Sequence, residues 1–175
     1  MATHVAFLRG INVGGHHKVP MKDLKVLLKS LGLREPGTLL ASGNAWFEAD
    51  EEDPAVLQDQ LAGALEARFG FAVPTIVRPA SEVVAVHDGG HPFAADAVDP
   101  RFLHVYFLGA VPEPDPDKTP DGPETLELRG AELFVHYVHG AGKSKLTTDR
   151  IERWLGVTAT SRNWNTVGKV ADKVR

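Results

Sequence analysis

The stretch TLLASGNAWFE, residues 38–48, decides how the first half of the chain is organised. Its two flanks are apolar, and Ser42-Gly43-Asn44 separates them. Gly and Asn are the residues that tight hairpin turns favour, because they adopt positive φ at little cost. The stretch therefore predicts a β-hairpin with a short turn at 42–44.

Helical and strand patterns flank this hairpin on both sides. Apolar residues at helical spacing predict two helices, and each is followed by a glycine suited to end it. Short apolar runs predict one strand before the first helix and one after the second. The order is then β-α-β-β-α-β, which is the ferredoxin-like order. The predicted segments are a strand at 4–8, a helix at 21–31, a helix at 53–69 and a strand at 73–77.

The second half of the chain shows a looser version of the same pattern. Its Pro- and Asp-rich stretch at 111–123 predicts an exposed loop in place of a regular element. The predicted segments are a helix at 81–87, a strand at 102–108, a hairpin at 124–138, a helix at 144–155, a short strand at 157–160 and a helix at 165–174. We therefore expect an α+β fold of two ferredoxin-like subdomains, residues 1–79 and 80–175, with antiparallel sheets and packed helices.

The composition is that of a folded protein of the cell interior. With 175 residues, 43% of them hydrophobic, the chain is long enough to bury a core. The absence of Cys excludes disulfides, a thiolate nucleophile and a Cys-ligated metal. The first residues do not have the pattern of a signal peptide, and no apolar run approaches the roughly 20 residues of a membrane helix. We expect a soluble, cytoplasmic protein without a membrane partner.

Basic residues are concentrated at the two ends of an acidic chain. The net charge is −4, yet residues 1–34 hold six basic residues against one acidic, and residues 140–175 hold eight against three. If the two ends meet, they form a basic face that attracts phosphates or nucleic acid. The alternative is ordinary solvated helix surface. The acidic overall balance argues against a dedicated high-affinity nucleic-acid binder.

A glycine-rich loop lies between the first strand and the first helix. Its glycines permit positive φ, and its backbone N–H groups, with two flanking cations, are suited to cradling an anion. The loop matches neither GxGxxG nor GxxxxGK[ST], so we do not expect a nucleotide-triphosphate loop. The alternative is a tight connection whose glycines serve geometry alone. The candidate ligand-binding residues here are Arg9, Asn12, Gly14, Gly15 and Lys18.

Two further polar motifs are candidates for the same site. Ser42 and Asn44 either form a polar cluster with the glycine loop or only shape the hairpin turn. Near the end of the chain, Arg162 is suited to clamping a phosphate or carboxylate, and Asn163 and Asn165 offer amide donors and acceptors.

The residues around this last motif leave two structural questions open. Thr160 or Ser161 is expected to cap the last helix. Trp164 either stacks on a ligand or fills the core. In the alternative interpretation the whole stretch is structural.

The eight His residues and the acidic run at 50–53 do not predict a metal site. Gly89-Gly90 separates His87 from His91, His136 falls in a predicted strand, and HExxH is absent. The acidic run suits a solvated loop that places negative charge near a helix N-terminus. We expect no metal and no cofactor, and no catalytic residue can be assigned from the sequence.

With these motifs in place, the chain resembles the bacterial domain of unknown function family number 1697. The resemblance extends over almost the whole chain, in order. It implies an α+β fold of two ferredoxin-like subdomains, and it supplies no activity. His16-His17 and Ser161 depart from the family pattern and bear on what the loops bind. The matching stretches are 7–15, 18–21 with Leu24, 42–44, 68–71, 77–78 and 162–167.

The sequence favours a binding protein with one polar, basic site. In this hypothesis the three motifs meet around an anionic ligand, either a phosphate-bearing metabolite or a nucleic acid. A rival hypothesis is an enzyme that acts on a phosphorylated or carboxylate small molecule in the same pocket, with His16 or His17 as base. A third is that the motifs only hold two subdomains together. The ligand, the oligomeric state and the pathway are not defined by the sequence.

Overall fold

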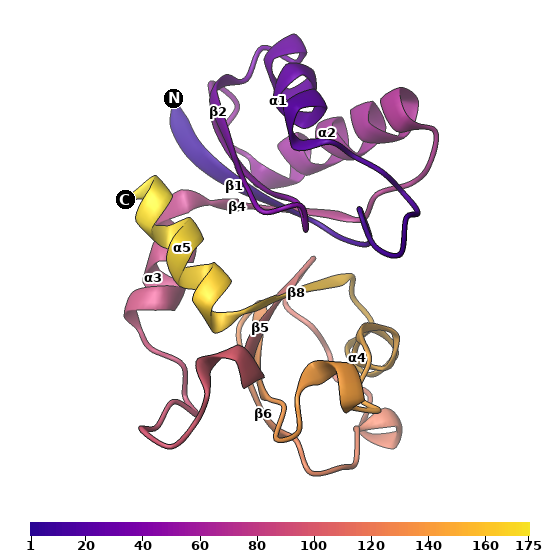
Figure 1. Cartoon of the computed structure of the whole chain (residues 1–175), viewed down its shortest axis with the longest axis vertical. Helices are drawn as coiled ribbons and strands as arrows, with labels where there is room; N and C mark the ends of the chain where they lie inside the picture. The colour runs from indigo at the N-terminus through magenta and orange to yellow at the C-terminus, as the bar shows by residue number, and fades with distance from the viewer. The chain divides into compact units, whose positions relative to one another are not determined.

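The chain folds into two four-stranded antiparallel sheets with five α-helices (Figure 1). The computed structural model describes residues 1–175. The backbone divides into two compact units. The first contains Met1–Ala85 together with Val170–Arg175, and the second contains Val86–Lys169. The α+β class expected from the sequence is confirmed.

The first unit contains one sheet with the strand order β2-β3-β1-β4, and all its neighbouring strands are antiparallel. A helix connects β1 to β2 and a second helix connects β3 to β4. The elements are β1 (Ala2–Leu8), α1 (Met21–Ser30), β2 (Arg34–Leu39), β3 (Asn44–Ala49), α2 (Pro54–Phe69) and β4 (Thr75–Pro79), followed by α3 (Ala80–Asp88). The hairpin predicted at 38–48 is the β2–β3 pair, so that prediction is confirmed.

Helix α2 has clear start and stop signals in the sequence. The Asp53 side chain accepts a hydrogen bond from the backbone N–H of Ala55 at 2.9 Å, and Pro54 occupies the first helical position. Gly70 ends the helix with φ of 82°, a conformation that favours glycine. These three residues explain why the predicted helix at 53–69 matches the observed one.

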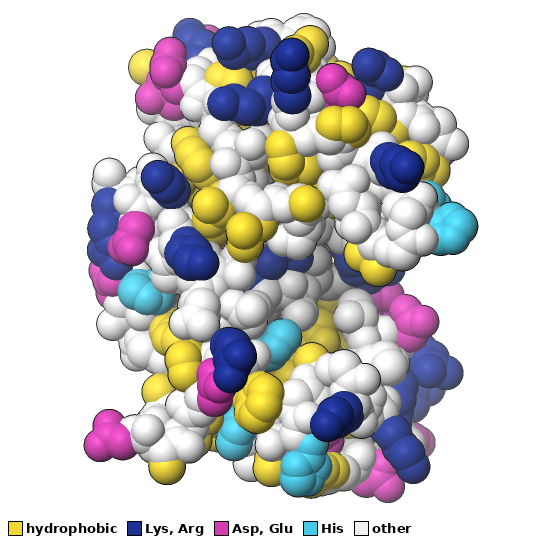
Figure 2. Space-filling model, viewed as in Figure 1, with side chains coloured by type: hydrophobic (Ala, Val, Ile, Leu, Met, Phe, Trp, Pro, Cys, Tyr) yellow, Lys and Arg dark blue, Asp and Glu magenta, His cyan; other side chains and the backbone are white.

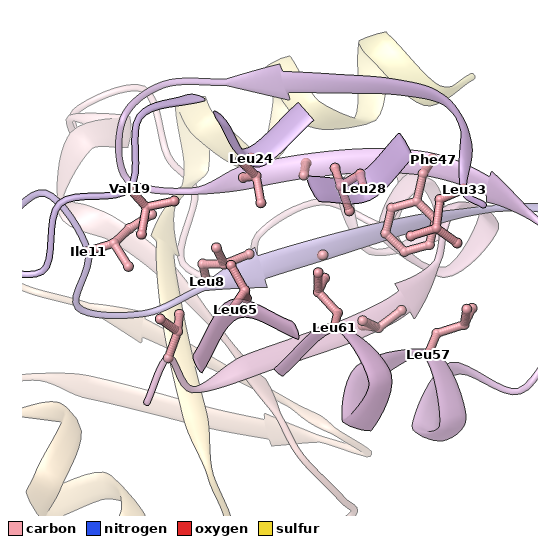
Figure 3. Close-up of a cluster of buried hydrophobic side chains, with 14 of the residues drawn as sticks. Leu8, Ile11, Val19, Leu24, Leu28, Leu33, Phe47, Leu57, Leu61 and Leu65 are labelled. Atoms are coloured by element: carbon pink, nitrogen blue, oxygen red, sulfur yellow. The ribbon is translucent and has the colours of Figure 1, made fainter. Parts of the chain in front are cut away.

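Helices α1 and α2 pack on one face of the sheet of the first unit. Figure 3 shows Leu24 and Leu28 of α1 and Leu57, Leu61 and Leu65 of α2 pointing into a common core. Side chains from the sheet complete this core, with Phe47 among them. Ile11 and Val19, at the two ends of the glycine-rich loop, are buried in the same core and so fix the base of the loop.

The second unit repeats the strand order with fewer helices. Its sheet has the order β6-β7-β5-β8, again antiparallel throughout. No α-helix lies between β5 and β6, and the connection contains only a short 3₁₀ turn. The elements are β5 (Leu103–Leu108), β6 (Thr125–Arg129), β7 (Glu132–His136), α4 (Thr148–Leu155), β8 (Ala159–Asn163) and α5 (Trp164–Val174). The 3₁₀ turns are η1 (Pro100–Phe102), η2 (Pro116–Lys118) and η3 (Ala141–Lys143).

The core of the second unit contains polar groups as well as apolar side chains. Ile151, Trp154 and Leu155 of α4 pack against the sheet. Beside them the buried hydroxyls of Tyr106 and Tyr137 are 2.6 Å apart, and the Tyr137 hydroxyl also donates to the Leu146 carbonyl at 3.0 Å. Because Tyr137 uses its hydrogen for Leu146, the Tyr106 hydroxyl donates to Tyr137.

Three predicted boundaries were wrong. Strand β4 is Thr75–Pro79, later than the predicted 73–77, because it pairs with β1 in that register. Helix α4 begins at Thr148, not at 144, because Thr147 caps it by accepting from the Arg150 N–H at 3.3 Å.

The third error concerns the strand that contains the candidate residues Arg162 and Asn163. The polar stretch at 159–163 is strand β8, paired with β5 from Leu108 to His104, whereas a short strand at 157–160 was predicted. Asn163, and not Thr160 or Ser161, caps α5, since its side-chain oxygen accepts from the Thr166 N–H at 2.9 Å.

Candidate functional site

The glycine-rich loop of the first unit is a small hairpin. Val13 and His16 form a bridge, with the His16 N–H donating to the Val13 carbonyl at 3.0 Å. Between them Gly14 and Gly15 have φ of 60° and 76°. A two-residue turn with positive φ at both central positions requires residues such as glycine. The two glycines are therefore explained by the turn itself.

The Asn12 side chain connects this loop to the β2–β3 turn by hydrogen bonds. Its side-chain amide donates to the Val19 carbonyl at 2.9 Å and to the Ala41 carbonyl at 2.7 Å, and its side-chain oxygen accepts from the Val19 N–H at 2.9 Å. Its φ is 56°, which Asn tolerates better than most residues. Two of the three predicted motifs, the glycine loop and the 42–44 turn, are thus brought together, and the Asn12 amide is engaged in holding them.

The 42–44 turn is also built from within. Asn44 is fully buried and its amide donates to the Leu39 carbonyl at 2.8 Å and to the Ser42 hydroxyl at 3.2 Å. A side chain at Gly43 would come within 2.8 Å of Leu8 and Ile11. Among the candidates of the first unit, Lys18 is exposed and Arg9 is half-buried.

The third predicted motif belongs to the second unit. Arg162 is 7% exposed, and one guanidinium nitrogen donates to the Thr160 hydroxyl at 3.0 Å and to the Ser161 carbonyl at 2.8 Å. Burial lowers the pKa of Arg162 to about 10. Asn163 caps α5, and Asn165 is exposed on that helix.

Trp164 is half-buried and packs against two histidines. Its ring centroid is 5.3 Å from that of His87, in a stacked arrangement, and 5.3 Å from that of His91, edge to face. The indole is thus in contact with the protein's own rings.

The second unit contains a polar cavity whose residues were not among the candidates predicted from the sequence. It measures about 400 Å³ and lies between the end of the β5–β6 connection, residues 121–124, and the loop that joins β7 to α4. Three Lys or Arg side chains and two carboxylates lie in its wall. The lining residues are Asp121, Gly122, Pro123, Glu124, His139, Lys143, Ser144, Lys145 and Arg150.

A second, smaller depression adjoins the cavity through Arg150. It measures about 300 Å³ and is lined by Lys118, Arg150 and Arg153. Together the two hollows hold five Lys or Arg side chains against two carboxylates, Asp121 and Glu124. Figure 2 shows Lys and Arg side chains around the α4 region of this unit, with Asp and Glu side chains among them. A surface with this excess of positive charge attracts anions.

The polar groups of the cavity wall are partly engaged with one another. The Ser144 hydroxyl donates a short hydrogen bond to Glu124 and accepts from the Leu146 N–H at 3.0 Å. Arg150 donates to the Lys145 carbonyl at 3.2 Å and to Asp121 at 3.4 Å. The Asp121 side chain is 99% exposed, so this ion pair is screened by water and contributes little to stability.

A sequence signal for this cavity does exist in the β7–α4 loop. Gly142-Lys143-Ser144 is the second half of the phosphate-loop pattern GxxxxGK[ST], and Tyr137 stands where the first glycine would be. In that motif the helix begins directly at the lysine, whereas here α4 begins at Thr148. The loop is therefore not a nucleotide-triphosphate loop, although it presents a lysine and a hydroxyl to the cavity.

A wide depression in the first unit has a different character. It measures about 610 Å³ and is lined by equal numbers of Lys or Arg and Glu side chains, with the chain's amino-terminal Met1 beside them. Arg34 at its edge is paired with Asp50 at 2.6 Å. Its lining residues are Met1, Lys29, Gly32, Leu33, Arg34, Glu35, Pro36 and Glu48. Because its charges balance, we regard the cavity of the second unit as the better candidate.

No group of three or more His, Asp or Glu side chains is placed to hold a metal ion. No helix has the length and apolar character needed to cross a membrane.

The fold and the cavity together define an α+β protein of two sheets with a basic polar site. The chain belongs to the family described as "Protein of unknown function (DUF1697)", which matches residues 1–134. The matched residues include the glycine loop and the 42–44 turn. They end before the β7–α4 loop, which lines the cavity, and before Arg162. No curated protein matches the chain.

One solved structure is similar to the chain over its whole length. It is the conserved bacterial protein SP0830 from Streptococcus pneumoniae, with 21% sequence identity, a TM-score of 0.66 and coverage of 99% of both chains. At this identity the likeness concerns the fold alone. Neither comparison supplies an activity.

Proposed function

We propose that the protein binds an anionic ligand that carries a phosphate group, in the cavity between the β5–β6 connection and the β7–α4 loop. The observation that supports this most directly is the lining of the cavity. Lys143, Lys145 and Arg150 face a hollow of about 400 Å³, and small-molecule sites occupy roughly 300–1,000 Å³. Lys and Arg side chains with a nearby hydroxyl, that of Ser144, are the groups that phosphate binds.

The site residues predicted from the sequence remain a separate proposal. In the first unit, Arg9 and Lys18 would supply cations beside the exposed Gly14-Gly15 turn. Asn12 and Asn44 would act indirectly, since their amides hold the loop and the turn together. A cytoplasmic location also remains a proposal, supported by the absence of Cys.

We also propose a ferredoxin-like topology for the first unit. Its strand order β2-β3-β1-β4 and its element order β-α-β-β-α-β support that assignment. The second unit would be a variant in which the first crossover helix is replaced by a loop.

Binding of inorganic phosphate, measured by isothermal titration calorimetry, tests the proposed function. The variant Lys143→Ala/Lys145→Ala removes two cations from the cavity. The matched control Lys22→Ala/Lys25→Ala removes two exposed lysines from α1. We expect affinity to fall about tenfold or more in the first variant, as the loss of charge-assisted hydrogen bonds predicts. The control should bind as the wild type does. Equal affinity in both variants would exclude the cavity.

One contact favours an enzyme as the alternative function. The Ser144 hydroxyl, at the cavity wall, donates to the Glu124 carboxylate, and a carboxylate in this position is suited to act as a general base. The alternative is an enzyme acting on a phosphorylated small molecule. Release of phosphate from a phosphate-monoester panel, abolished in both Ser144→Ala and Glu124→Gln, would support it. Activity that persists in both variants would count against it.

A further inference from the structure

Arg150 belongs to both hollows of the second unit. It lines the cavity that contains Lys143 and Lys145, and it lines the neighbouring depression that contains Lys118 and Arg153. Arg150 is thus shared by two hollows that each contain two further cations. A ligand that reaches across Arg150 would contact all five positive side chains, whereas a single phosphate would contact one group.

The donors of Arg150 are held by weak partners. One nitrogen donates to the Lys145 carbonyl at 3.2 Å, and another donates to Asp121 at 3.4 Å. Both distances exceed the usual range for a charge-assisted hydrogen bond, roughly 2.7–2.9 Å. The Asp121 carboxylate is almost fully exposed, so a phosphate oxygen can replace it without leaving a buried charge unpaired.

The cations of the smaller depression have partners within the protein that are exposed to solvent. Lys118 forms an ion pair with Asp115 at 2.8 Å, and both side chains are substantially exposed. Arg153 donates from Nε to the Asp149 carbonyl at 3.4 Å. Exposed pairs of this kind contribute roughly 0–1 kcal/mol, and so they can be exchanged for a ligand with more charge.

The extent of the positive surface limits the size of the ligand. The second unit carries nine Lys and Arg residues against twelve Asp and Glu residues over residues 86–169. The basic patch is therefore a local feature of an acidic unit. A nucleic acid requires a basic stripe that follows its backbone, so the charge distribution favours a compact ligand.

We propose that the site takes a small molecule with two linked phosphoryl groups, a diphosphate, with one group on each side of Arg150. Lys143 and Lys145 bind one phosphoryl group, Lys118 and Arg153 bind the other, and Arg150 contacts both. The proposal rests on the proposed function, because it uses the same cavity for the first phosphoryl group.

The test compares inorganic phosphate with pyrophosphate by calorimetry at constant ionic strength. For the wild type we expect pyrophosphate to bind about tenfold tighter or more, since charge-assisted contacts are added on the second side. The variant Lys118→Ala/Arg153→Ala should lose this preference, so that its affinities for pyrophosphate and phosphate differ by about twofold or less. The variant Lys143→Ala/Lys145→Ala should bind both ligands weakly.

Different outcomes separate the two proposals. Equal wild-type affinities for phosphate and pyrophosphate, or a preference that survives in Lys118→Ala/Arg153→Ala, would overturn the diphosphate proposal alone. Absence of binding by both ligands would overturn the proposed function itself. A DNA or RNA tetramer that binds tighter than pyrophosphate would overturn the assignment to a small molecule. The charge-preserving variant Lys118→Arg/Arg153→Lys, which should keep the preference, separates loss of charge from loss of folding.

Discussion

The two units share a strand order and differ in how they cover one face of the sheet. In the first unit α1 connects β1 to β2, and in the second unit a Pro- and Asp-rich connection with η2 takes that place. The face of the first sheet is covered by leucines from two helices. In the second unit, α4 has 8 residues where α2 has 16, and the connection itself ends at the cavity.

This difference in how the sheets are covered affects where each unit has room for a ligand. In the first unit, α1 and α2 fill one face of the sheet with apolar side chains. Replacing a crossover helix with an irregular connection exposes backbone and polar side chains next to the sheet, and such loops on a rigid scaffold are where binding groups concentrate. The first unit then has the more uniform hydrophobic core, and the second unit contains the cavity for which we propose binding. Four experiments test this comparison.

The largest expected effect is loss of packing in the first unit. Leu61 of α2 is 1% exposed in the core shared by the two helices. Leu61→Ala should reduce the free energy of unfolding by about 2–5 kcal/mol, because it removes buried methyl groups and leaves a cavity. Urea denaturation followed by circular dichroism measures this change in the free energy of unfolding. Val56→Ala on the same helix, at a side chain that is 50% exposed, should change stability by less than about 0.5 kcal/mol.

The second expected effect is a dependence on pH that arises in the second unit. Burial lowers the pKa of His104 from its ordinary value of 6.5 to about 4, and burial also lowers the pKa of His91. The unfolded chain takes up a proton below about pH 6.5 while folded His104 stays neutral to about pH 4, so stability falls as the pH falls through this window. At pH 4.5 the His104 contribution is a loss on the order of 2 kcal/mol relative to pH 7.5.

Denaturant titrations at pH 7.5 and 4.5 measure this effect. His104→Gln should reduce the difference between the two pH values. His16→Gln, at an exposed histidine of the first unit, should leave it unchanged. A wild-type stability that does not fall toward pH 4.5 would contradict the prediction.

The third experiment concerns the polar part of the second core. Tyr137→Phe removes the hydroxyl that joins Tyr106 to the Leu146 carbonyl. The Tyr106 hydroxyl and the Leu146 carbonyl then each lose a hydrogen bond in a buried site. The expected cost is about 1–3 kcal/mol. In the double variant Tyr106→Phe/Tyr137→Phe the two losses should be less than additive, because the hydroxyls interact with each other. Additive losses from thermal denaturation would show that they act independently.

The smallest expected effect is at the helix caps of the second unit. Asn163 accepts from the Thr166 N–H at 2.9 Å and Thr147 accepts from the Arg150 N–H at 3.3 Å. Asn163→Ala and Thr147→Ala should each cost about 1 kcal/mol. Asn163→Asp, which preserves the acceptor, should restore most of the loss. A large loss of ligand affinity with unchanged stability in Asn163→Ala would instead favour the ligand-binding role predicted from the sequence.

The sequence predicted those parts of the fold that depend on local signals. Helix α2 could be placed to within a residue, because Asp53, Pro54 and Gly70 mark its ends. The β2–β3 hairpin was recognisable from its Gly-Asn turn. The bounds of strand β8 could not be recognised in this way, because Thr160 to Asn163 is a polar stretch. It is held extended by pairing with β5, a strand more than 50 residues earlier in the chain.

The candidate site was harder to predict for a similar reason. The glycines and asparagines that stood out in the first unit turn out to serve turn geometry and loop attachment, as Gly14 and Asn12 show. The basic residues of the cavity come from separate segments, and only folding brings Lys118 near Arg150 and Arg153. The one local signal was Gly142-Lys143-Ser144, which is recognisable only when an incomplete phosphate-loop pattern is considered.

The hydrogen bonds around Leu146 have a consequence for the thermodynamics of binding. The Leu146 carbonyl accepts from the buried Tyr137 hydroxyl, and the Leu146 N–H donates to Ser144 at the cavity wall. The wall segment is therefore positioned by the core before a ligand arrives. Less conformational entropy is lost there on association, so more of the interaction energy is expressed as affinity. In this sense the tyrosine pair in the core would preorganise the cavity for which we propose binding, without touching it.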